Sequence, residues 1–436
     1  MIRRWKIWAL LVGLVAALSA FGSLAAAQSK TAGPAAKAGG TTLTWWHNAT
    51  IGPQRAYWQK VANDFHKLHP NVTVKPVPIQ NEQLQNTKIP LALQSNDPPD
   101  IFQQWGGGAL GTQVKAGKVA DLTSLSKPWI ATLGGAVAGW QYKGKQYGVP
   151  YNLGVVGFWY NKALFKQAGI SGPPATWTDL FSDVTKLKAA NIVPIAIGSK
   201  DRWPDAFYWD YLAVRVCSKA ALQSAAVDLK FTDSCWVKAG TLTQQLLDAK
   251  PFQDGFLGTP AQQGASSSAG MIGNGKAAME LQGHWDEGTM NSLTPDNKGI
   301  GSSLGWFPFP SVPGGKGIPG AALGGGDGYS CSWKAPQPAC AQFLQYLVSK
   351  PVQTGWAKLG IGLPTAKGAE VGIADPILRA VATARGKSPF VQTYLDIAYP
   401  TAVGQALDSA IADLFAGTKN PKQVVDAIAK SAKSSH

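Results

Sequence analysis

The N-terminal part of the chain alternates short β-prone runs with segments of helical periodicity. The runs "TLTWW", "NVTVKPV" and "DIFQQ" carry β-branched and aromatic residues, which is typical of strands. Between the first two runs, apolar residues recur with helical spacing over residues 53–68, and Pro70 closes this predicted helix. Residues 82–94 are predicted as a second helix. The order of strand, helix, strand, helix and strand predicts a mostly parallel sheet with helices on its faces.

The same alternation returns in the middle of the chain. Residues 154–161 ("GVVGFWYN") and 192–197 ("IVPIAI") are predicted strands on either side of a helix. That helix begins with Thr176 at the N-cap position and Asp179 at N3, the pattern of a capping box. Further predicted features are a small-residue loop at 264–270, a strand at 277–283, a Gly/Pro-rich stretch at 308–328, and helices at 342–347 and 402–416. The pattern therefore indicates a second α/β lobe.

Length and composition support two folded lobes with a polar surface. At 436 residues the chain is long enough for two cores, and with 45% hydrophobic but only 15% charged residues its surface is neutral rather than ionic. The 17 tryptophans are a large excess and favour flat, uncharged ligands such as sugars. The formal net charge of +15 falls to +12 without three basic residues near the N-terminus, and the other basic residues are scattered. We interpret this charge as a solvated surface and expect no nucleic acid partner.

The N-terminus has the pattern of a secretory signal peptide. Three basic residues precede an apolar run over residues 7–24, and Ala25, Ala26 and Ala27 form a small-residue cleavage site. We therefore expect export to the periplasm or the cell exterior, with an uncleaved membrane anchor as the alternative. No cysteine follows the apolar run, which argues against a lipid anchor. Residues 28–40, which are small, polar or Lys, are predicted to be a flexible leader.

The four cysteines favour disulfides over a metal site. Cys217 and Cys235 are close in sequence, as are Cys331 and Cys340, so two local bridges are the natural pairing in an exported protein. Four cysteines also permit other connectivities. Metal ligation is the weaker interpretation because neither pair has C-x2-C spacing and no histidine lies beside them.

Motifs for phosphate binding and catalysis are incomplete. Gly106–Gly108 follow a predicted strand but match neither the P-loop nor the dinucleotide pattern, and the G-x4-G-K run that begins at Gly270 ends in Ala277, which has no hydroxyl. H-E-x-x-H and G-x-S-x-G are absent. Asp286 and Glu287 are the best candidates for paired carboxylates of glycosidase chemistry. We expect a protein without a cofactor, a metal site or catalytic residues.

Aromatic and polar residues gather at the ends of the predicted strands. The clusters are "WWHN" (45–48), "QQW" (103–105), "RWPDAFYWDY" (202–211), "GHWDEG" (283–288) and "GGGDGY" (324–329). Sugar sites combine an aromatic face with carboxylate and amide groups, and these residue types coincide here. Packing in the hydrophobic core is the alternative role for these aromatic residues, and we expect it for Trp45 or Trp46 and for part of residues 207–211.

Taken together, these segments resemble the extracellular solute-binding proteins that deliver sugars to ABC importers, a group that includes maltose-, cellobiose- and xylobiose-type receptors. The resemblance is carried, in order, by "TLTWWHN", "FHKLHPNVTVK", "DPPDIFQQWGGG", "YGVPYNLGVVGFWYNKALFKQAGI", "PPATWTDL", "GKAAMELQGHW" and "LGIGLPTAKG". It implies an α/β, two-lobe periplasmic-binding-protein-like fold of type II, with the ligand in a cleft between the lobes. The lobes would close by hinge motion where the chain crosses between them, near residues 152–154, 320–326 and 364–368.

The resemblance also implies a domain organisation and a site. The implied organisation is a signal peptide at 1–27, the leader at 28–40, lobe 1 at 41–152 plus about 325–366, and lobe 2 at 153–324 plus about 367–436. Carried over position by position, the residues at the ligand are His47, Asn48, Trp105, Gly106, Asn152, Trp203, Trp209, Asp210, Trp285, Asp286 and Asp327. The expected partners are an oligosaccharide and the membrane permease subunits of an ABC importer, with the receptor itself a monomer.

Two other functions stay open at this stage. An exported carbohydrate-active enzyme would release reducing ends from its substrate. A receptor of the same fold for a polyamine or a metal needs clustered carboxylates or converging His, Asp, Glu or Tyr side chains, and no such cluster is visible in the sequence.

Overall fold

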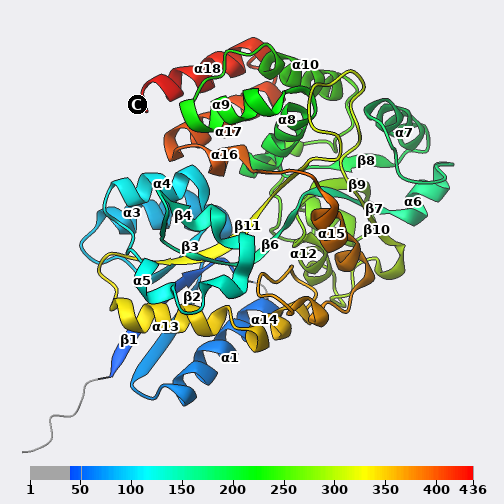
Figure 1. Ribbon diagram of the computed structural model, residues 1–436. Helices are drawn as coiled ribbons and strands as arrows, with labels where there is room; N and C mark the ends of the chain where they lie inside the picture. The colour runs from blue at the N-terminus through cyan, green and yellow to red at the C-terminus, as the bar shows by residue number, and fades with distance from the viewer. Residues whose placement is uncertain (1–39, 51, 436) are drawn as a thin grey trace, which may run out of the picture. The chain divides into compact units, whose positions relative to one another are not determined.

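The computed structural model describes residues 40–50 and 52–435. The predicted signal peptide, and all of the predicted leader except Gly40, lie outside these residues. Two main sheets carry the architecture (Figure 1). Within the described ranges, no helix combines the length and the apolar character needed to cross a membrane.

The first sheet has the strand order β12-β11-β3-β1-β2, and β6 also pairs with β11. Strands β1 (Thr41–His47), β2 (Val72–Pro78) and β3 (Ile101–Gln104) are parallel, as the sequence pattern predicts. Strand β11 (Ala322–Cys331) returns antiparallel to β3 and to β6 (Val149–Val155), while β12 (Val391–Thr393) is parallel to β11. Figure 1 shows α1 and α13 on one side of this sheet and α3 and α4 on the other.

The second sheet has the order β10-β7-β9-β8. Strands β8 (Val193–Ala196) and β9 (Ala277–Gln282) are parallel, and β7 (Gly157–Asn161) and β10 (Leu304–Phe307) add antiparallel pairs. A short hairpin of β4 (Gln141–Tyr142) and β5 (Lys145–Gln146) is separate. Helices α8, α10, α17 and α18 lie together near the top of the view in Figure 1.

The helices connect these strands and cover both sheets. Their bounds are α1 (Gly52–Leu68), α2 (Asn81–Gln83), α3 (Ile89–Gln94), α4 (Gly107–Lys115), α5 (Thr123–Ser126), α6 (Lys162–Gln167), α7 (Trp177–Ala189), α8 (Trp203–Val216), α9 (Lys219–Asp228), α10 (Cys235–Asp248), α11 (Ser268–Gly273), α12 (Asp286–Ser292), α13 (Gln337–Leu347), α14 (Lys350–Ala357), α15 (Pro376–Lys387), α16 (Leu395–Ala398), α17 (Thr401–Phe415) and α18 (Pro421–Lys433). Helix α7 begins with the predicted capping box: the Thr176 hydroxyl accepts the Asp179 N–H at 3.1 Å, and the Asp179 carboxylate accepts the Thr176 N–H at 2.9 Å.

Aromatic side chains form much of the core on the first sheet. Trp58 and Trp356 stack with ring centroids 4.5 Å apart, and Trp45 meets Trp58 at 5.5 Å. Trp45 and Trp58 are fully buried, and Trp356 is nearly so. Core packing, the alternative weighed for "WW", thus accounts for Trp45.

Three sequence predictions differ from the structure in instructive ways. The helix predicted at 82–94 is three pieces, with a π turn at Leu84–Lys88, because Pro90 has no N–H to donate to the preceding turn. The strand predicted at 154–161 is divided at Val156, where the chain leaves the first sheet and enters the second. Strand β11 lies partly in the Gly/Pro-rich stretch at 308–328, for which the sequence pattern predicts no strand.

Both local disulfides are present, which confirms the predicted pairing. Cys217 bonds to Cys235 and Cys331 bonds to Cys340. Each bridge joins a buried segment to the start or first turns of a helix, α10 or α13. The bridges therefore fix the ends of two helices that cover the cores.

Replacing both Cys217 and Cys235 by Ala should lower the free energy of unfolding by about 3 kcal/mol, because this bridge spans 18 residues and its loss frees the unfolded chain. The matched variant without the Cys331–Cys340 bridge, which spans 9 residues, should lose somewhat less, about 2.5 kcal/mol. Urea unfolding followed by circular dichroism measures both losses. Equal stability of the first variant and the unmodified protein would contradict this account.

Candidate functional site

The candidate site is a cleft lined by 21 of the residues that the structure describes. Strand ends and loops of the first sheet form one part of its lining: Asn48, Thr50, Gln54, Gln80, Asn81, Gln85, Trp105, Tyr151, Asn152, Gly326 and Asp327. The other part comes from α8, the start of α12, α14, the segment after β12 and two loops that carry Gln262 and Ile361: Trp203, Phe207, Gln262, Trp285, Thr289, Trp356, Ile361, Tyr394, Asp396 and Ile397. The cleft therefore brings together residues that are far apart in the sequence.

The polar floor of the cleft lies at the carboxyl ends of parallel strands. Asn48 follows β1, Asn81 follows β2, and Trp105 follows β3. Open α/β sheets bind ligands at this edge because the loops after successive strands converge there. The Asn48 side-chain amide donates to the Asn81 carbonyl oxygen at 3.0 Å, so these two loops are already in contact.

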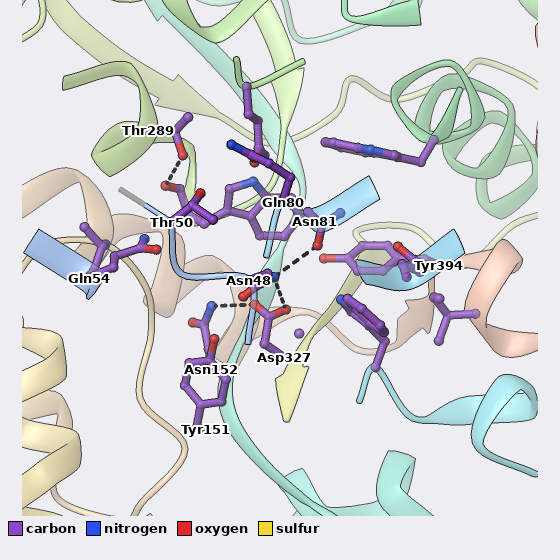
Figure 2. A pocket seen from close by; sticks show the side chains of 18 of the residues that line it. Asn48, Thr50, Gln54, Gln80, Asn81, Tyr151, Asn152, Thr289, Asp327 and Tyr394 are labelled. Atoms are coloured by element: carbon purple, nitrogen blue, oxygen red, sulfur yellow. Dashed lines mark hydrogen bonds between the residues drawn. The ribbon is translucent and has the colours of Figure 1, made fainter. Parts of the chain in front are cut away.

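Three amide side chains surround the carboxylate of Asp327, and two of them, Asn48 and Asn152, are drawn in Figure 2. Gln103 donates to Oδ1 at 2.7 Å, Asn48 donates to the same oxygen at 3.3 Å, and Asn152 donates to Oδ2 at 3.1 Å. Asn152 is the cross-strand partner of Asp327, and a register shift after Asp327 marks a bulge that redirects the strand. Burial raises the pKa of Asp327, and the amide hydrogen bonds oppose that rise.

Asn152 also connects the two sheets. Its Oδ1 accepts the backbone N–H of Leu363 at 2.8 Å and lies 2.8 Å from Nε2 of His284, which follows β9. Because the Asn152 amide nitrogen faces Asp327, the oxygen must accept, and His284 carries its hydrogen on Nε2. Burial lowers the pKa of His284 to about 3, so the ring is neutral. A Cβ at Gly154 would lie 2.2 Å from Cγ of this ring, so only glycine permits the contact.

An aromatic wall faces the polar floor. Trp203 and Trp285 meet edge to face with centroids 6.3 Å apart, and Tyr394 meets Trp285 at 6.4 Å and Phe207 at 5.2 Å. Trp203 and Trp285 are only partly buried, whereas Phe207 and Tyr394 are buried. The two tryptophans thus offer flat apolar surface to a ligand in the cleft.

The cleft has no basic side chain among its described lining residues. Its ionisable carboxyl groups are those of Asp327 and Asp396, and burial raises the pKa of Asp396 to about 6. A ligand with a negative group would therefore find no counter-charge inside the cleft. Amides, aromatic rings and two carboxylates are groups that recognise hydroxyl donors.

The structure brings six of the sequence-predicted site residues together at the cleft: Asn48, Trp105, Asn152, Trp203, Trp285 and Asp327. His47 lies beneath the floor instead, fully buried, with Nδ1 accepting the N–H of Ala49 at 3.2 Å. Burial lowers the pKa of His47 to about 3. Gly106 begins α4 at φ +81, where a Cβ would lie 2.4 Å from the carbonyl oxygen of Gly139.

Trp209 and Asp210 are not among the residues that line the cleft. Trp209 is fully buried against α10, where a Cβ at Gly240 would lie 2.4 Å from its ring. Asp210 is also fully buried, and its Oδ2 accepts the N–H of Leu395, the first residue of α16. Burial raises the pKa of Asp210 well above its ordinary value. These two residues thus position elements that border the cleft.

Asp286 lies behind the aromatic wall. It is fully buried and is not among the lining residues, although its neighbour Trp285 is. Burial raises the pKa of Asp286 to about 8, and burial together with the Asp286 carboxylate raises that of Glu280 well above its ordinary value. Glu287, its partner in the sequence-based catalytic pair, is also buried and outside the lining, with a pKa raised to about 8 by burial.

Sequence reasoning missed two groups of lining residues. Gln80, Asn81 and Gln85 follow β2, and the rule that ligands bind at the carboxyl ends of parallel strands could have found them. Tyr394 and Asp396 follow β12, a three-residue strand too short to be recognised in the sequence.

Comparisons with known proteins agree with this architecture. An uncharacterized ABC transporter extracellular-binding protein of Pyrococcus horikoshii is 24% identical over 441 residues, covering 97% of this chain and 94% of the relative. The multiple sugar-binding protein of Streptococcus mutans is 25% identical over 335 residues, or 73% of each chain. A structure solved in work on xylan utilization by Caldanaerobius polysaccharolyticus has a TM-score of 0.82 and 26% identity, covering 89% of this chain and 99% of that one.

The family assignment rests on most of the chain. Residues 48–354 match the bacterial extracellular solute-binding protein family, and this range includes Asn48, Asn81, Trp105 and Trp285. The match and the shared fold confirm the predicted two-lobe α/β fold with a cleft between the lobes. Members of this family are binding proteins and not enzymes, as the sequence also predicts. This chain belongs to the family of bacterial extracellular solute-binding proteins.

Proposed function

We propose that this protein is an exported receptor for an oligosaccharide that closes around its ligand and delivers it to the permease of an ABC importer. The observation that carries the proposal is the pairing of a partly exposed tryptophan wall with an amide-lined floor in a cleft that has no basic lining residue. Tryptophan faces suit the apolar C–H face of a pyranose, and amides suit its hydroxyl groups. The relatives named for sugars and for xylan utilization support the same ligand class.

We assign the stacking role to Trp285 and Trp203, and the hydroxyl contacts to Asn48, Asn81 and Asn152. Trp105 borders the floor and adds a third ring. Three partly buried tryptophans line the cleft, Trp105, Trp203 and Trp285, and this supports an oligosaccharide over a monosaccharide because each ring offers one stacking face. In this proposal Asp210 and Asp286 position elements and do not contact the sugar.

The proposal includes export and domain organisation. Residues 1–27 act as a cleavable signal peptide that delivers a monomeric receptor to the periplasm or the cell exterior. The lobes are residues 41–152 plus about 325–366 and residues 153–324 plus about 367–436, and they move about the crossing segments. Hinge closure would bring the tryptophan wall onto a sugar held by the floor.

Replacing Trp285 by Ala should weaken oligosaccharide binding about tenfold to a hundredfold, because the variant loses the apolar stacking face. Isothermal calorimetry against xylo-, chito-, cello- and malto-oligosaccharides measures the affinity, and thermal shift reports the fold. The matched control is Trp209→Phe, which changes a tryptophan that does not line the cleft and should keep the affinity. If no oligosaccharide of the panel binds the unmodified protein, the proposal is wrong.

Asp286→Asn should keep sugar affinity and should stabilise the protein more at pH 8 than at pH 6.5. The native carboxyl, with a pKa of about 8, keeps a proton that the unfolded chain releases near pH 4, so the free energy of unfolding falls as pH rises between these values. His47 and His284, with pKa values of about 3, act in the opposite sense only below about pH 6.5. Between pH 6.5 and 8, the pH dependence of the free energy of unfolding therefore comes from the buried carboxyl groups and not from these two histidines.

The expected difference for Asp286→Asn across that window is about 1 to 2 kcal/mol, since one proton contributes at most about 1.4 kcal/mol per pH unit. Urea unfolding at the two pH values measures it. Asp254→Asn, at an exposed position, is the matched control and should show no such difference. A loss of sugar affinity in Asp286→Asn with an unchanged fold would instead show that Asp286 contributes to sugar binding.

A further inference from the structure

A second groove opens beside the cleft on the first lobe. Thr50 and Gln80 line both, so the two spaces are neighbours across these side chains. The groove, which we call the rim groove, has an empty volume of about 890 Å³ and is also lined by Trp46, Arg55 and Lys88. Its residues come from β1 and the loop after it, the first turn of α1, the end of β2 and the segment after β2, which carries Lys88.

The rim groove differs from the cleft in charge. Arg55 and Lys88 are exposed, and neither forms a salt bridge with a carboxylate among the residues that the structure describes. The cleft, in contrast, has carboxylates from Asp327 and Asp396 and no basic residue in its described lining. An acidic group on a ligand would therefore be disfavoured in the cleft and favoured in the rim groove.

The rim groove also offers apolar surface. Trp46 is partly buried on the cluster that contains Leu84 and Phe102, and part of its ring stays accessible. Val77, which is 36% exposed, lies in the same lining. A tryptophan face beside two cations matches a sugar ring that carries a carboxylate, because the ring can stack while the carboxylate pairs with the guanidinium and ammonium groups.

We propose that the rim groove is a subsite for a uronic acid residue of an oligosaccharide whose neutral part occupies the cleft. The subsite rests on the proposed function, since the same oligosaccharide would continue from the cleft past Thr50 and Gln80 into the rim groove. Arg55 supplies a planar donor pair for the carboxylate and Lys88 supplies a second positive charge. The protein thus distinguishes acidic branched or acid-terminated glycans from neutral ones at its rim and not in its cleft.

The test compares matched ligand pairs by calorimetry at low ionic strength. Each pair is a neutral trisaccharide of xylose or glucose and the same trisaccharide with one added glucuronic acid residue. The unmodified protein should bind the acidic member about threefold to tenfold more tightly, the range for partly exposed ion pairs. Because exposed charges are screened by salt, this preference should shrink in about 0.5 M NaCl.

The deciding variant is Arg55→Gln combined with Lys88→Gln, which removes both charges and keeps good helix formers. It should bind both members of each pair equally, with the affinity of the unmodified protein for the neutral sugar. The matched control, Lys115→Gln with Lys127→Gln, removes two exposed charges of the same lobe outside both grooves and should keep the acidic preference.

Each other outcome overturns the proposal at an identifiable step. Equal binding of both members by the unmodified protein, or a preference that survives in the deciding variant, contradicts the subsite. Glucuronate alone that binds equally well with the cleft filled or empty indicates an independent anion site. Failure of every sugar, neutral and acidic, to bind contradicts the proposed function itself.

Discussion

The side-chain amide of Asn152 is the contact on which both the cleft floor and the junction of the two sheets depend. Its nitrogen donates to Asp327 in the first sheet, and its oxygen accepts from Leu363 and from His284, which follows β9 of the second. No other neutral side chain of this size offers two donors and an acceptor in this arrangement. If the amide were removed, Asp327 would lose a donor and His284 would be left with a buried, unpaired N–H. The cleft floor and the junction of the two sheets therefore share this one residue.

This network also explains how a buried carboxylate can face a sugar site without attracting cations. The negative charge of Asp327 is balanced by amide hydrogens from Gln103, Asn48 and Asn152. The same bonds orient Asn48 and Asn152, whose side chains reach the cleft lining. Asp327 thereby acts chiefly as the centre that positions neutral groups, and the cleft remains suited to hydroxyl recognition while positive charge is confined to the rim.

The sequence predicts elements well where local chemistry decides them and poorly where tertiary contacts do. The β1–β3 strands and the Thr176 capping box follow from periodicity and side-chain hydrogen bonding. The sequence pattern predicts no strand at β11, where three glycines precede Asp327, yet a Cβ at Gly326 would lie 1.9 Å from the carbonyl oxygen of Asn152. Trp203 and Trp209 share one aromatic helix, and only the packing of α10 against Trp209 determines which of them faces the cleft. No pattern along the chain contains that information.

The structural role of the glycines after β3 depends on a segment that is distant in the sequence. Gly106–Gly108 look like a phosphate loop, but a Cβ at Gly107 would lie 2.4 Å from the carbonyl oxygen of Ile397, and one at Gly108 would lie 2.4 Å from the carbonyl carbon of Tyr399. The glycines thus allow α4 to touch the backbone of α16 and the residue after it. The N-terminus of α16 is held by Asp210, and α16 supplies Asp396 and Ile397 to the cleft. Close backbone contact at this edge, and not anion binding, is therefore the physical reason for the run of glycines beside Trp105.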